Sequence, residues 1–536
     1  MARFFEDLAR AVALFQPKPK PAYFPRKTIA GDYDKLFALA RKGEPETESD
    51  AARAIYGEEG RKALGRYFTL KSRLKDRLEQ SVFFFSPESA LSEREARYYR
   101  LWKRRLTVWA LWKSGAVESA AREWEKIAEE AELYGWNDVC VEAYARLRLA
   151  RGARQGSAVL WKKYDDALAA ALRRQSEELR VEGALAEIEL VKNRETLLGN
   201  ENVEKCRAGY ELAERLAREE PLRYGAQALF AKAGYLLAEA RGDFTEALRL
   251  TESARDCLRR TKGGLDSETA AEFDAAALSY ALLTRNIESC QAVAARRLES
   301  LAPAPEPVPL ALDYWFLTAL AAARYEDVAA VVRFVFARRS ALERSPARRE
   351  RWKLYEAYAR LILTDEELAA LPSLFQPRFS FRAILSAPSE TPSDAPTDAP
   401  TNAPEKAAAS LRLAYGFLRL TLVVEKRDFV AALSVIQELE PLRERYLRKD
   451  APDYRAQCFL RMTIAAAAAQ FDAAETRKKT ESYCRRLAEA RAFDRVKTLS
   501  PEVAPFERMW EFLLASFQDK TSLPAPSLRN ALRSLS

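Results

Sequence analysis

The sequence predicts an all-α protein, an α-solenoid of antiparallel helix pairs. Apolar residues recur at helical spacing over most of the 536 residues, and strand-like alternation is scarce. A polar turn, an apolar residue and a small residue three positions later recur about every forty residues, which is typical of a helical repeat. Because 48% of the residues are hydrophobic, the chain can form an extensive buried core.

The clearest copy of this turn lies at residues 242–250. Gly242 and Asp243 form the turn, Phe244 is the apolar residue and Ala247 is the small one. Each repeat of about forty residues has room for two helices of roughly fifteen residues. Nine apolar residues mark the expected turns, and the widest gap contains an insertion: Val117, Val159, Val203, Phe244, Ile287, Tyr325, Leu368, Phe429 and Phe471.

This turn and its small residues resemble the tetratricopeptide repeat (TPR). The resemblance rests on residues 242–247 and on Ala254, seven residues beyond Ala247. It departs from the family at Tyr235, which occupies a position for a small residue, and in a unit longer than about 34 residues. The resemblance implies helix pairs that form a groove for a protein or peptide partner. HEAT-type pairing is the alternative.

The N-terminal segment, residues 1–30, is expected to be an amphipathic helix and a proline-rich tether. Phe4, Leu8 and Phe15 share one helical face, and this helix either docks onto the protein or lies on a membrane surface. It lacks the uncharged stretch of a secretory signal. No run of about 18 apolar residues predicts a transmembrane segment.

A helical pattern then runs over residues 49–82, with Lys71 and Lys75 projecting into its apolar arc. The capping-box pattern from Ser92 to Glu95 predicts the start of another helix. That helix carries an aromatic cluster, for which we expect core packing, with nucleotide stacking as the alternative: Tyr98, Trp102, Trp109 and Trp112. Residues 116–131 are expected to form its partner helix.

The main helical array is expected over residues 31–386. Residues 387–404 repeat Asp-Ala-Pro-Thr, a composition that predicts a disordered linker. A C-terminal helical module is expected over residues 405–536, in which Pro441 should break or kink a helix that starts near Val430.

Basic residues exceed acidic ones only slightly, by 87 to 78, but they concentrate in two places. Residues 61–77 form one basic patch. A second patch contains Arg338, Arg339, Arg344, Arg348, Arg349, Arg351 and Lys353. Such patches are usually solvated helix faces, and the alternative is binding of nucleic acid or phosphate.

A C-terminal set of basic and aromatic residues is the candidate partner-binding site. Its members surround two adjacent repeats: Arg445, Tyr446, Arg448, Lys449, Arg455 and Arg461. They could equally be surface charges paired with Glu440 and Glu444. Together with residues 71–77 and 505–511, this set is similar to a group of large bacterial helical-repeat proteins, a resemblance that implies the architecture and no activity.

Catalysis is not expected. The chain has no histidine, which is the commonest general base and metal ligand, and no phosphate-binding loop or nucleophile-elbow motif. Its six cysteines are far apart, so we expect no metal site, no cofactor and a reduced, cytoplasmic setting. We therefore expect an interaction scaffold. Nucleic-acid binding is the second hypothesis, and a hydrolase or transferase that uses clustered carboxylates is the third.

Overall fold

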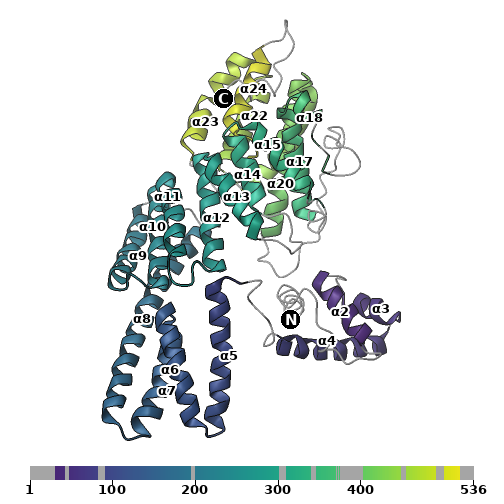
Figure 1. Ribbon diagram of the computed structural model, residues 1–536. Coiled ribbons are helices and arrows are strands. Elements are labelled where there is room, and N and C mark those ends of the chain that lie inside the picture. Colours follow the sequence, from purple (N-terminus) through teal and green to yellow (C-terminus); the bar gives the residue numbers. More distant parts are fainter. Residues whose placement is uncertain are drawn as a thin grey trace. The chain divides into compact units, whose positions relative to one another are not determined.

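The computed structural model is all-helical in the part of the chain that it describes (Figure 1). These residues are 30–42, 47–58, 60–81, 91–194, 200–300, 310–337, 339, 346–369, 371, 373–374, 403–447, 454–490, 496 and 500–518. They form 21 α-helices and one short π-helix, and they contain no strand. None of these helices is long and apolar enough to cross a membrane. The predicted N-terminal helix and most of the predicted 387–404 linker lie outside the described residues.

The chain forms two compact units. The first comprises Met1–Ala186, Ala208–Ala233 and Ser253–Ala271, and the second comprises Glu187–Arg207, Gly234–Glu252 and Glu272–Ser536. The division passes through five helices: α8 (Ala158–Arg194), α9 (Asn200–Glu219), α10 (Tyr224–Arg241), α11 (Phe244–Arg259) and α12 (Ser267–Thr284).

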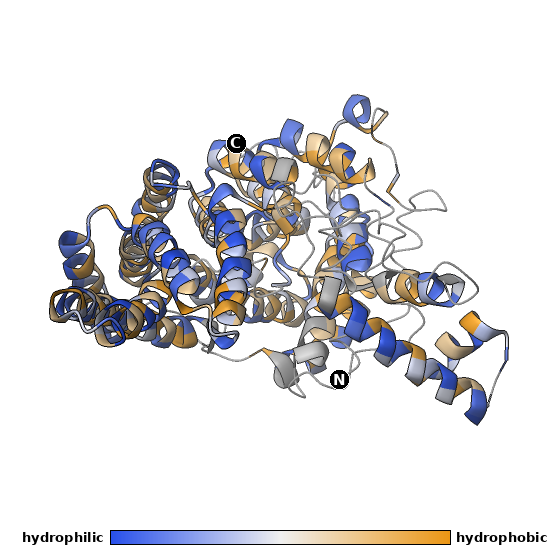
Figure 2. Cartoon of the chain, turned by 60° about the horizontal axis from the view of Figure 1, so that its bottom comes forward, coloured by the Kyte–Doolittle hydropathy of each residue, from blue (hydrophilic) through white to orange (hydrophobic). Residues whose placement is uncertain are grey.

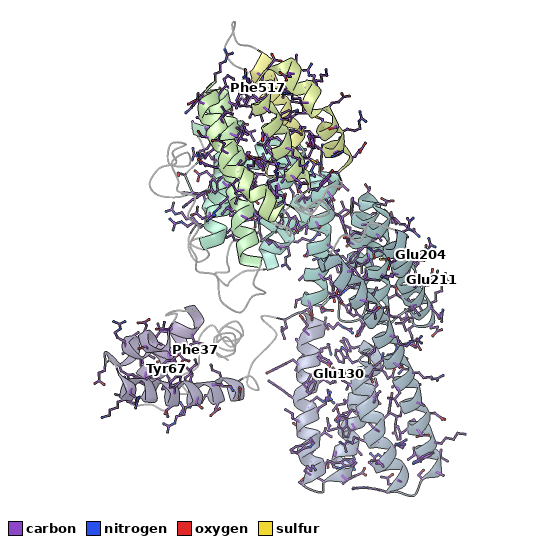
Figure 3. The ribbon with its side chains drawn as sticks, turned by 180° about the vertical axis from the view of Figure 1, so that it is seen from behind. Phe37, Tyr67, Glu130, Glu204, Glu211 and Phe517 are labelled. Atoms are coloured by element: carbon purple, nitrogen blue, oxygen red, sulfur yellow. The ribbon has the colours of Figure 1, made fainter. Side chains whose placement is uncertain are left out.

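The other helices of the first unit fall into two groups. The first group is α2 (Ala30–Lys42), α3 (Glu48–Tyr56) and α4 (Arg61–Ser81), and the second is α5 (Glu93–Lys113), α6 (Val117–Tyr134), α7 (Asn137–Leu147) and the π-helix (Arg148–Ala153). Helices α2, α3 and α4 pack around Leu36 and Leu74, with Phe37 and Tyr67 at this core (Figure 3).

The pattern predicted as one helix over residues 49–82 is two helices. Gly57 ends α3 in the left-handed conformation, at φ 71°, which a residue with a side chain adopts at a cost. Lys71 reaches past the apolar arc of α4 to Glu48, at 2.9 Å from Nζ to Oε1. Its stem therefore packs along the core while its charge is paired.

The described part of the second unit continues with ten further helices. They are α13 (Ile287–Ser300), α14 (Leu310–Ala321), α15 (Tyr325–Phe336), α17 (Pro346–Ile362), α18 (Asp365–Ala369), α20 (Ala403–Glu425), α21 (Phe429–Tyr446), α22 (Tyr454–Ala468), α23 (Ala473–Glu489) and α24 (Phe506–Gln518). Contacts link each pair in the runs α13 to α15 and α20 to α24. Figure 2 shows apolar residues lying between neighbouring helices and polar residues on outer faces.

One turn geometry recurs along the described chain. At eight helix ends, the amide of one residue bonds the carbonyl three before it, and the next amide bonds the carbonyl five before it. This is the Schellman motif, and its turning residue has φ between 52° and 84°. The eight turning residues are Gly115, Gly135, Gly156, Gly242, Arg285, Ala323, Arg427 and Gln470.

At several of these turns a polar side chain also starts the next helix. Asp243 accepts a hydrogen bond from the Glu246 amide at 2.9 Å, and Asn286 accepts one from the Ser289 amide at 3.0 Å. Asp428 does the same for Ala431, at 2.9 Å. One short sequence therefore ends one helix and caps the next, because each side-chain oxygen satisfies an amide that has no helical partner.

Five of the nine predicted turn markers are the first residue of a helix: Val117, Phe244, Ile287, Tyr325 and Phe429. Val159 and Val203 lie within the first turn of α8 and α9, Leu368 lies in α18, and Phe471 lies two residues before α23. Ala247 is fully buried, as its small-residue role predicts. Tyr235 is also buried, and its hydroxyl donates to Glu272 at 3.0 Å, which explains why a large residue fits there.

Helix α14 of the second unit is apolar on nearly every side. Residues Ala311–Leu317 of α14 are nearly all buried, and so are Trp352 to Ala359 of α17. A helix that is hydrophobic all round must be covered all round. The last described helix, α24, packs against α17, where the Tyr358 hydroxyl lies 4.0 Å from the Met509 sulfur. Its Phe506 stacks on Phe459 of α22, with ring centroids 4.4 Å apart.

Helices on the two sides of the predicted linker pack together in the second unit. Helix α17 contacts α20, and the Tyr415 hydroxyl donates to the Glu350 carbonyl at 2.9 Å. Of the break or kink expected at Pro441, the break does not occur, because α21 continues through the proline to Tyr446. Leu439, two residues before the proline, is buried against Gly416, so packing holds the helix together despite the missing amide donor.

Candidate partner-binding face

Helix α5 carries an exposed apolar row. Ser92 and Glu95 form the predicted capping box at its start. Leu101 and Val108 are buried against α6, whereas the neighbouring residues Trp102, Leu106 and Trp109 are 46%, 46% and 58% exposed. Because these three are spaced i, i+4, i+7, they lie on one face about 100° around the helix from Leu101. We call them the α5 row.

The N-terminal end of the α5 row borders helix α7. The Tyr98 hydroxyl donates to Asp138 at 3.0 Å, and the Tyr98 ring packs edge-on to Trp102. Arg105 lies over the Trp102 ring at 4.0 Å and pairs with Glu142. Burial and the nearby Asp138 charge raise the pKa of Tyr98, which keeps its hydroxyl a donor. This end is therefore held by paired polar groups and carries the exposed Asp138 carboxylate.

The C-terminal end of the α5 row carries cations. Lys113 lies 5.9 Å from the centre of the Trp109 ring, while Arg146 and Arg154 lie 5.7 and 5.2 Å from that of Trp112. All three cations are exposed, and none forms an ion pair within the described chain. We call Lys113, Arg146 and Arg154 the cation cluster. Because the rings attract positive charge, they hold these side chains near the row.

The π-helix fixes two members of the cation cluster, since it lies between Arg146 and Arg154. Gly152 approaches α8 so closely that an added Cβ would lie 2.6 Å from the Trp161 Cα. Arg151 anchors the other side, with Nη1 2.7 Å from Glu118 and Nε 2.9 Å from Glu125. The backbone that presents the cations is therefore tightly held.

A polar network at the C-terminal end of α6 joins this helix to α7, to α8 and to Arg223, the residue before α10. Glu132 accepts hydrogen bonds from Arg174 at 2.7 Å and from Arg223 at 2.6 Å, and both arginines also reach the buried Asn137. Burial opposes ionisation of Glu132, but the hydrogen bond and charges of Arg223 and Arg174 outweigh it and lower its pKa. The carboxylate stays charged and cross-links the helices.

The basic patch at residues 338–353 is largely engaged within its own unit. Arg348 lies 3.5 Å from the buried Asp313 of α14, Arg351 lies over the Tyr355 ring, and Lys353 pairs with Glu350 at 2.5 Å. Arg339 is exposed and lies 4.6 Å from the centre of the Phe336 ring. Arg349 lies half-buried in α17, and Arg338 and Arg344 lie outside the described residues.

In the other predicted basic patch, at residues 61–77, most cations also contact groups of the same chain. Lys71 pairs with Glu48 and Lys75 with Glu79, while Arg66 and Arg77 lie over tyrosine rings. In both basic patches, most of the described cations therefore already contact an acidic residue or an aromatic ring of the same unit. The three cations beside the α5 row lie outside both patches.

The C-terminal set is only partly described. Arg455 is buried, and its guanidinium binds both oxygens of Glu502 at 2.8 Å and Glu507 at 2.7 Å. Arg461 is half-buried, with Nη1 3.4 Å from the Tyr483 hydroxyl. The side chains of Arg445, Tyr446, Arg448 and Lys449 lie outside the described residues. Arg455 therefore acts as an internal clamp between α22 and the start of α24.

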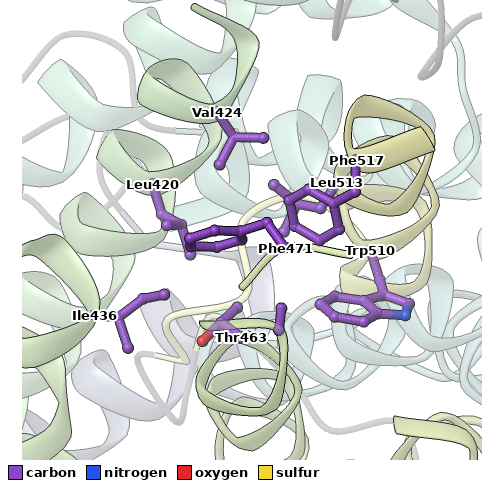
Figure 4. A pocket seen from close by; sticks show the side chains of 9 residues that line it. Leu420, Val424, Ile436, Thr463, Phe471, Trp510, Leu513 and Phe517 are labelled. Atoms are coloured by element: carbon purple, nitrogen blue, oxygen red, sulfur yellow. The ribbon is translucent and has the colours of Figure 1, made fainter. Parts of the chain in front are cut away.

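An apolar pocket in the second unit offers no polar chemistry. Nine residues from α20, α21, α22 and α24 and from the turn before α23 line this narrow pocket, among them Leu420, Phe471, Trp510 and Phe517 (Figure 4). Its one hydroxyl, that of Thr463, donates to the Leu460 carbonyl at 2.8 Å. The described residues also hold no group of three acidic or cysteine side chains that could bind a metal ion.

Comparisons with protein-family models, with curated proteins and with solved structures find no match to this chain.

The prediction that the tryptophans of α5 pack in the core is wrong for two of them. Leu101 is buried and Trp112 half-buried, but Trp102 and Trp109 are exposed. The spacing of Trp102, Leu106 and Trp109 was a usable signal, because it places them on a different face from Leu101 and Val108. The cation cluster had no such signal, since its members come from three segments of the chain.

Proposed function

We propose that this protein is a protein-interaction scaffold, built as a TPR-like α-solenoid and without catalytic activity. The spacing of the turns supports the repeat: Gly242, Arg285 and Ala323 are 43 and 38 residues apart, and Arg427 and Gln470 are 43 apart. Stacked helix pairs of this kind present extended surfaces that bind other proteins.

The α5 row is the single observation that carries the proposal. Two tryptophans and a leucine remain about half exposed on one helix, beside a well-packed core. Aromatic anchors with a polar rim are the usual centre of a protein interface. The bordering Arg105–Glu142 pair and the cation cluster supply such a rim.

The test compares the wild-type chain with the triple variant Trp102→Ala, Leu106→Ala, Trp109→Ala in quantitative affinity capture from its native cells. We expect a reproducible protein to be recovered with the wild type and reduced at least about tenfold with the variant, because the loss of aromatic anchors weakens an interface by several kcal/mol. Melting temperature and circular dichroism establish that the variant is folded.

The matched control removes three other exposed leucines of the same unit: Leu133→Ala, Leu179→Ala and Leu222→Ala. It should recover the same protein as the wild type. Equal recovery by the wild type, the row variant and the control would refute a role for the α5 row. Failure to recover any reproducible partner with the wild type would count against the scaffold proposal itself.

A further inference from the structure

The two ends of the α5 row differ in charge. Asp138 and the Arg105–Glu142 pair lie at the Trp102 end, and the cation cluster lies at the Trp109 end. Lys113, Arg146 and Arg154 contribute three positive charges there. The Glu118 carboxylate, at the start of α6, is already paired with Arg151 and Arg122. A partner that covers the row must therefore meet an apolar surface and then a concentrated positive charge.

We infer that the partner of this face is an amphipathic helix with an acidic end. This inference rests on the proposed scaffold function and specifies its partner. The apolar side of that helix covers Trp102, Leu106 and Trp109, and its acidic end lies over the cation cluster. Charge complementarity identifies the occupant, because carboxylates satisfy three exposed cations that the described chain leaves without an ion pair.

The spacing of the row sets the dimensions of the partner. Trp102 and Trp109 are seven residues apart, which is about 10 Å along a helix, and Lys113 lies about 6 Å further on. A helix that reaches from the row to the cations therefore needs about three turns. Its apolar residues fall at i, i+4 and i+7, the pattern of a helix that binds in a groove.

Two other kinds of partner are alternatives to a helix. A peptide that adds a β-strand needs an open sheet edge, and the described residues contain no strand. An anionic membrane would also be attracted by the cation cluster, and a vesicle experiment distinguishes it from a protein partner.

The test uses full-length protein and three fluorescein-labelled peptides in an anisotropy titration. One peptide has leucines at i, i+4 and i+7 followed by three glutamates, a second has three lysines in place of the glutamates, and a third scrambles the leucines of the first. We expect the acidic peptide to bind about tenfold or more tightly than either other peptide, with weaker binding at high salt.

Charge reversal of the cation cluster provides the decisive comparison. The variant Lys113→Glu, Arg146→Glu, Arg154→Glu should lose the preference for the acidic peptide and favour the lysine peptide. The variant Arg173→Glu, Arg215→Glu, Arg260→Glu changes the net charge equally at exposed sites of the same unit and should bind like the wild type. Weak binding of all three peptides, or equal binding of the acidic and lysine peptides, would overturn the inference.

A vesicle experiment separates a membrane from a protein partner. Phosphatidylserine vesicles should bind the wild type and the row variant Trp102→Ala, Leu106→Ala, Trp109→Ala equally, because the row is expected to face a helix and not a bilayer. Row-dependent binding to vesicles but not to the acidic peptide would overturn the inference in favour of a membrane. If native capture requires the α5 row but no acidic preference is found, the scaffold function stands and this inference fails. If native capture does not require the row, the proposed role of this face fails first.

Discussion

At the scale of single residues, the turns depend on a left-handed backbone conformation that only some of their residues suit. Gly242 adopts it without steric cost, whereas Ala323 and Arg427 adopt it at φ 58° and 60° with a side chain present. A side chain in this conformation costs about 1 kcal/mol or more. These turns form nonetheless because the helices on both sides pack, so packing overrides a local preference.

Exchange of alanine and glycine at equivalent turns tests this explanation. We expect Ala323→Gly to raise the free energy of unfolding by about 0.5 to 1 kcal/mol, because glycine relieves the left-handed strain. The reverse change, Gly242→Ala, should lower it by about 1 kcal/mol. Urea denaturation measures both, and a destabilised Ala323→Gly variant would show that the alanine methyl group matters more than the backbone.

Asp313 is a single residue whose charge opposes folding. Burial raises the pKa of this carboxyl, and the charges of Arg348 and Arg351 offset the rise only in part. A raised pKa in the folded state means that stability is lost as the pH rises and the buried group ionises. We expect Asp313→Asn to melt at a higher temperature than the wild type at pH 7.

At pH 4 more of the Asp313 carboxyl is protonated in the folded protein than at pH 7, because its pKa is raised, so this gain should shrink. Thermal melts of both proteins at the two pH values provide the measurement. A lower melting temperature for Asp313→Asn at pH 7 would mean that the pairing with Arg348 outweighs the cost of burial.

At the scale of elements, helices approach each other where the sequence supplies small residues. Ala247 lies fully buried at the start of α11, one turn after the Gly242 turn. We expect Ala247→Leu to destabilise the protein by about 1 to 3 kcal/mol through overpacking. The control Thr245→Leu, at an exposed position of the same helix, should change stability by less than about 0.5 kcal/mol. Equal melting temperatures for wild type and Ala247→Leu would contradict the close approach of these helices.

Gly152 of the π-helix is a second close approach. An alanine Cβ would overlap the Trp161 backbone, so Gly152→Ala should cost about 1 to 3 kcal/mol and displace Arg146 or Arg154. Gly183, in the middle of α8, has no neighbouring atom within 4 Å of an added Cβ, and Gly183→Ala should stabilise by up to about 1 kcal/mol. Calorimetry of the two variants measures both changes in stability. An unchanged melting temperature for Gly152→Ala would show that α8 can move away from the added methyl group at no cost.

At the scale of the whole molecule, α24 completes the second unit. Phe506 is fully buried between Phe417 and Phe459, and the Arg455–Glu502 pair fixes the segment that leads into the helix. We expect Phe506→Ala to cost about 3 to 5 kcal/mol. Hydrogen exchange should then accelerate in α20, α22 and α24 but not in α5 to α7. Uniform acceleration across both groups of helices would contradict the division into two units.

The helical class and most turns of this protein follow from its sequence, whereas the candidate face does not. Helical periodicity and the Gly-Asp-Phe pattern predict where helices begin, because capping and turn formation depend on neighbouring residues. Charge counts predicted basic patches whose described members mostly contact acids or rings of the same unit, since composition does not reveal pairing.

Local sequence by itself determined that the chain is all-α, where its turns fall and which small residues allow helices to approach. Tertiary structure alone decided which apolar residues are covered. Leu101 and Trp102 are adjacent apolar residues of α5, yet Leu101 is buried against α6 and Trp102 is nearly half exposed. The physical reason is that the burial of a side chain depends on which neighbouring helix lies against its face of the helix. In the same way, Lys113, Arg146 and Arg154 come together only when their three segments fold side by side.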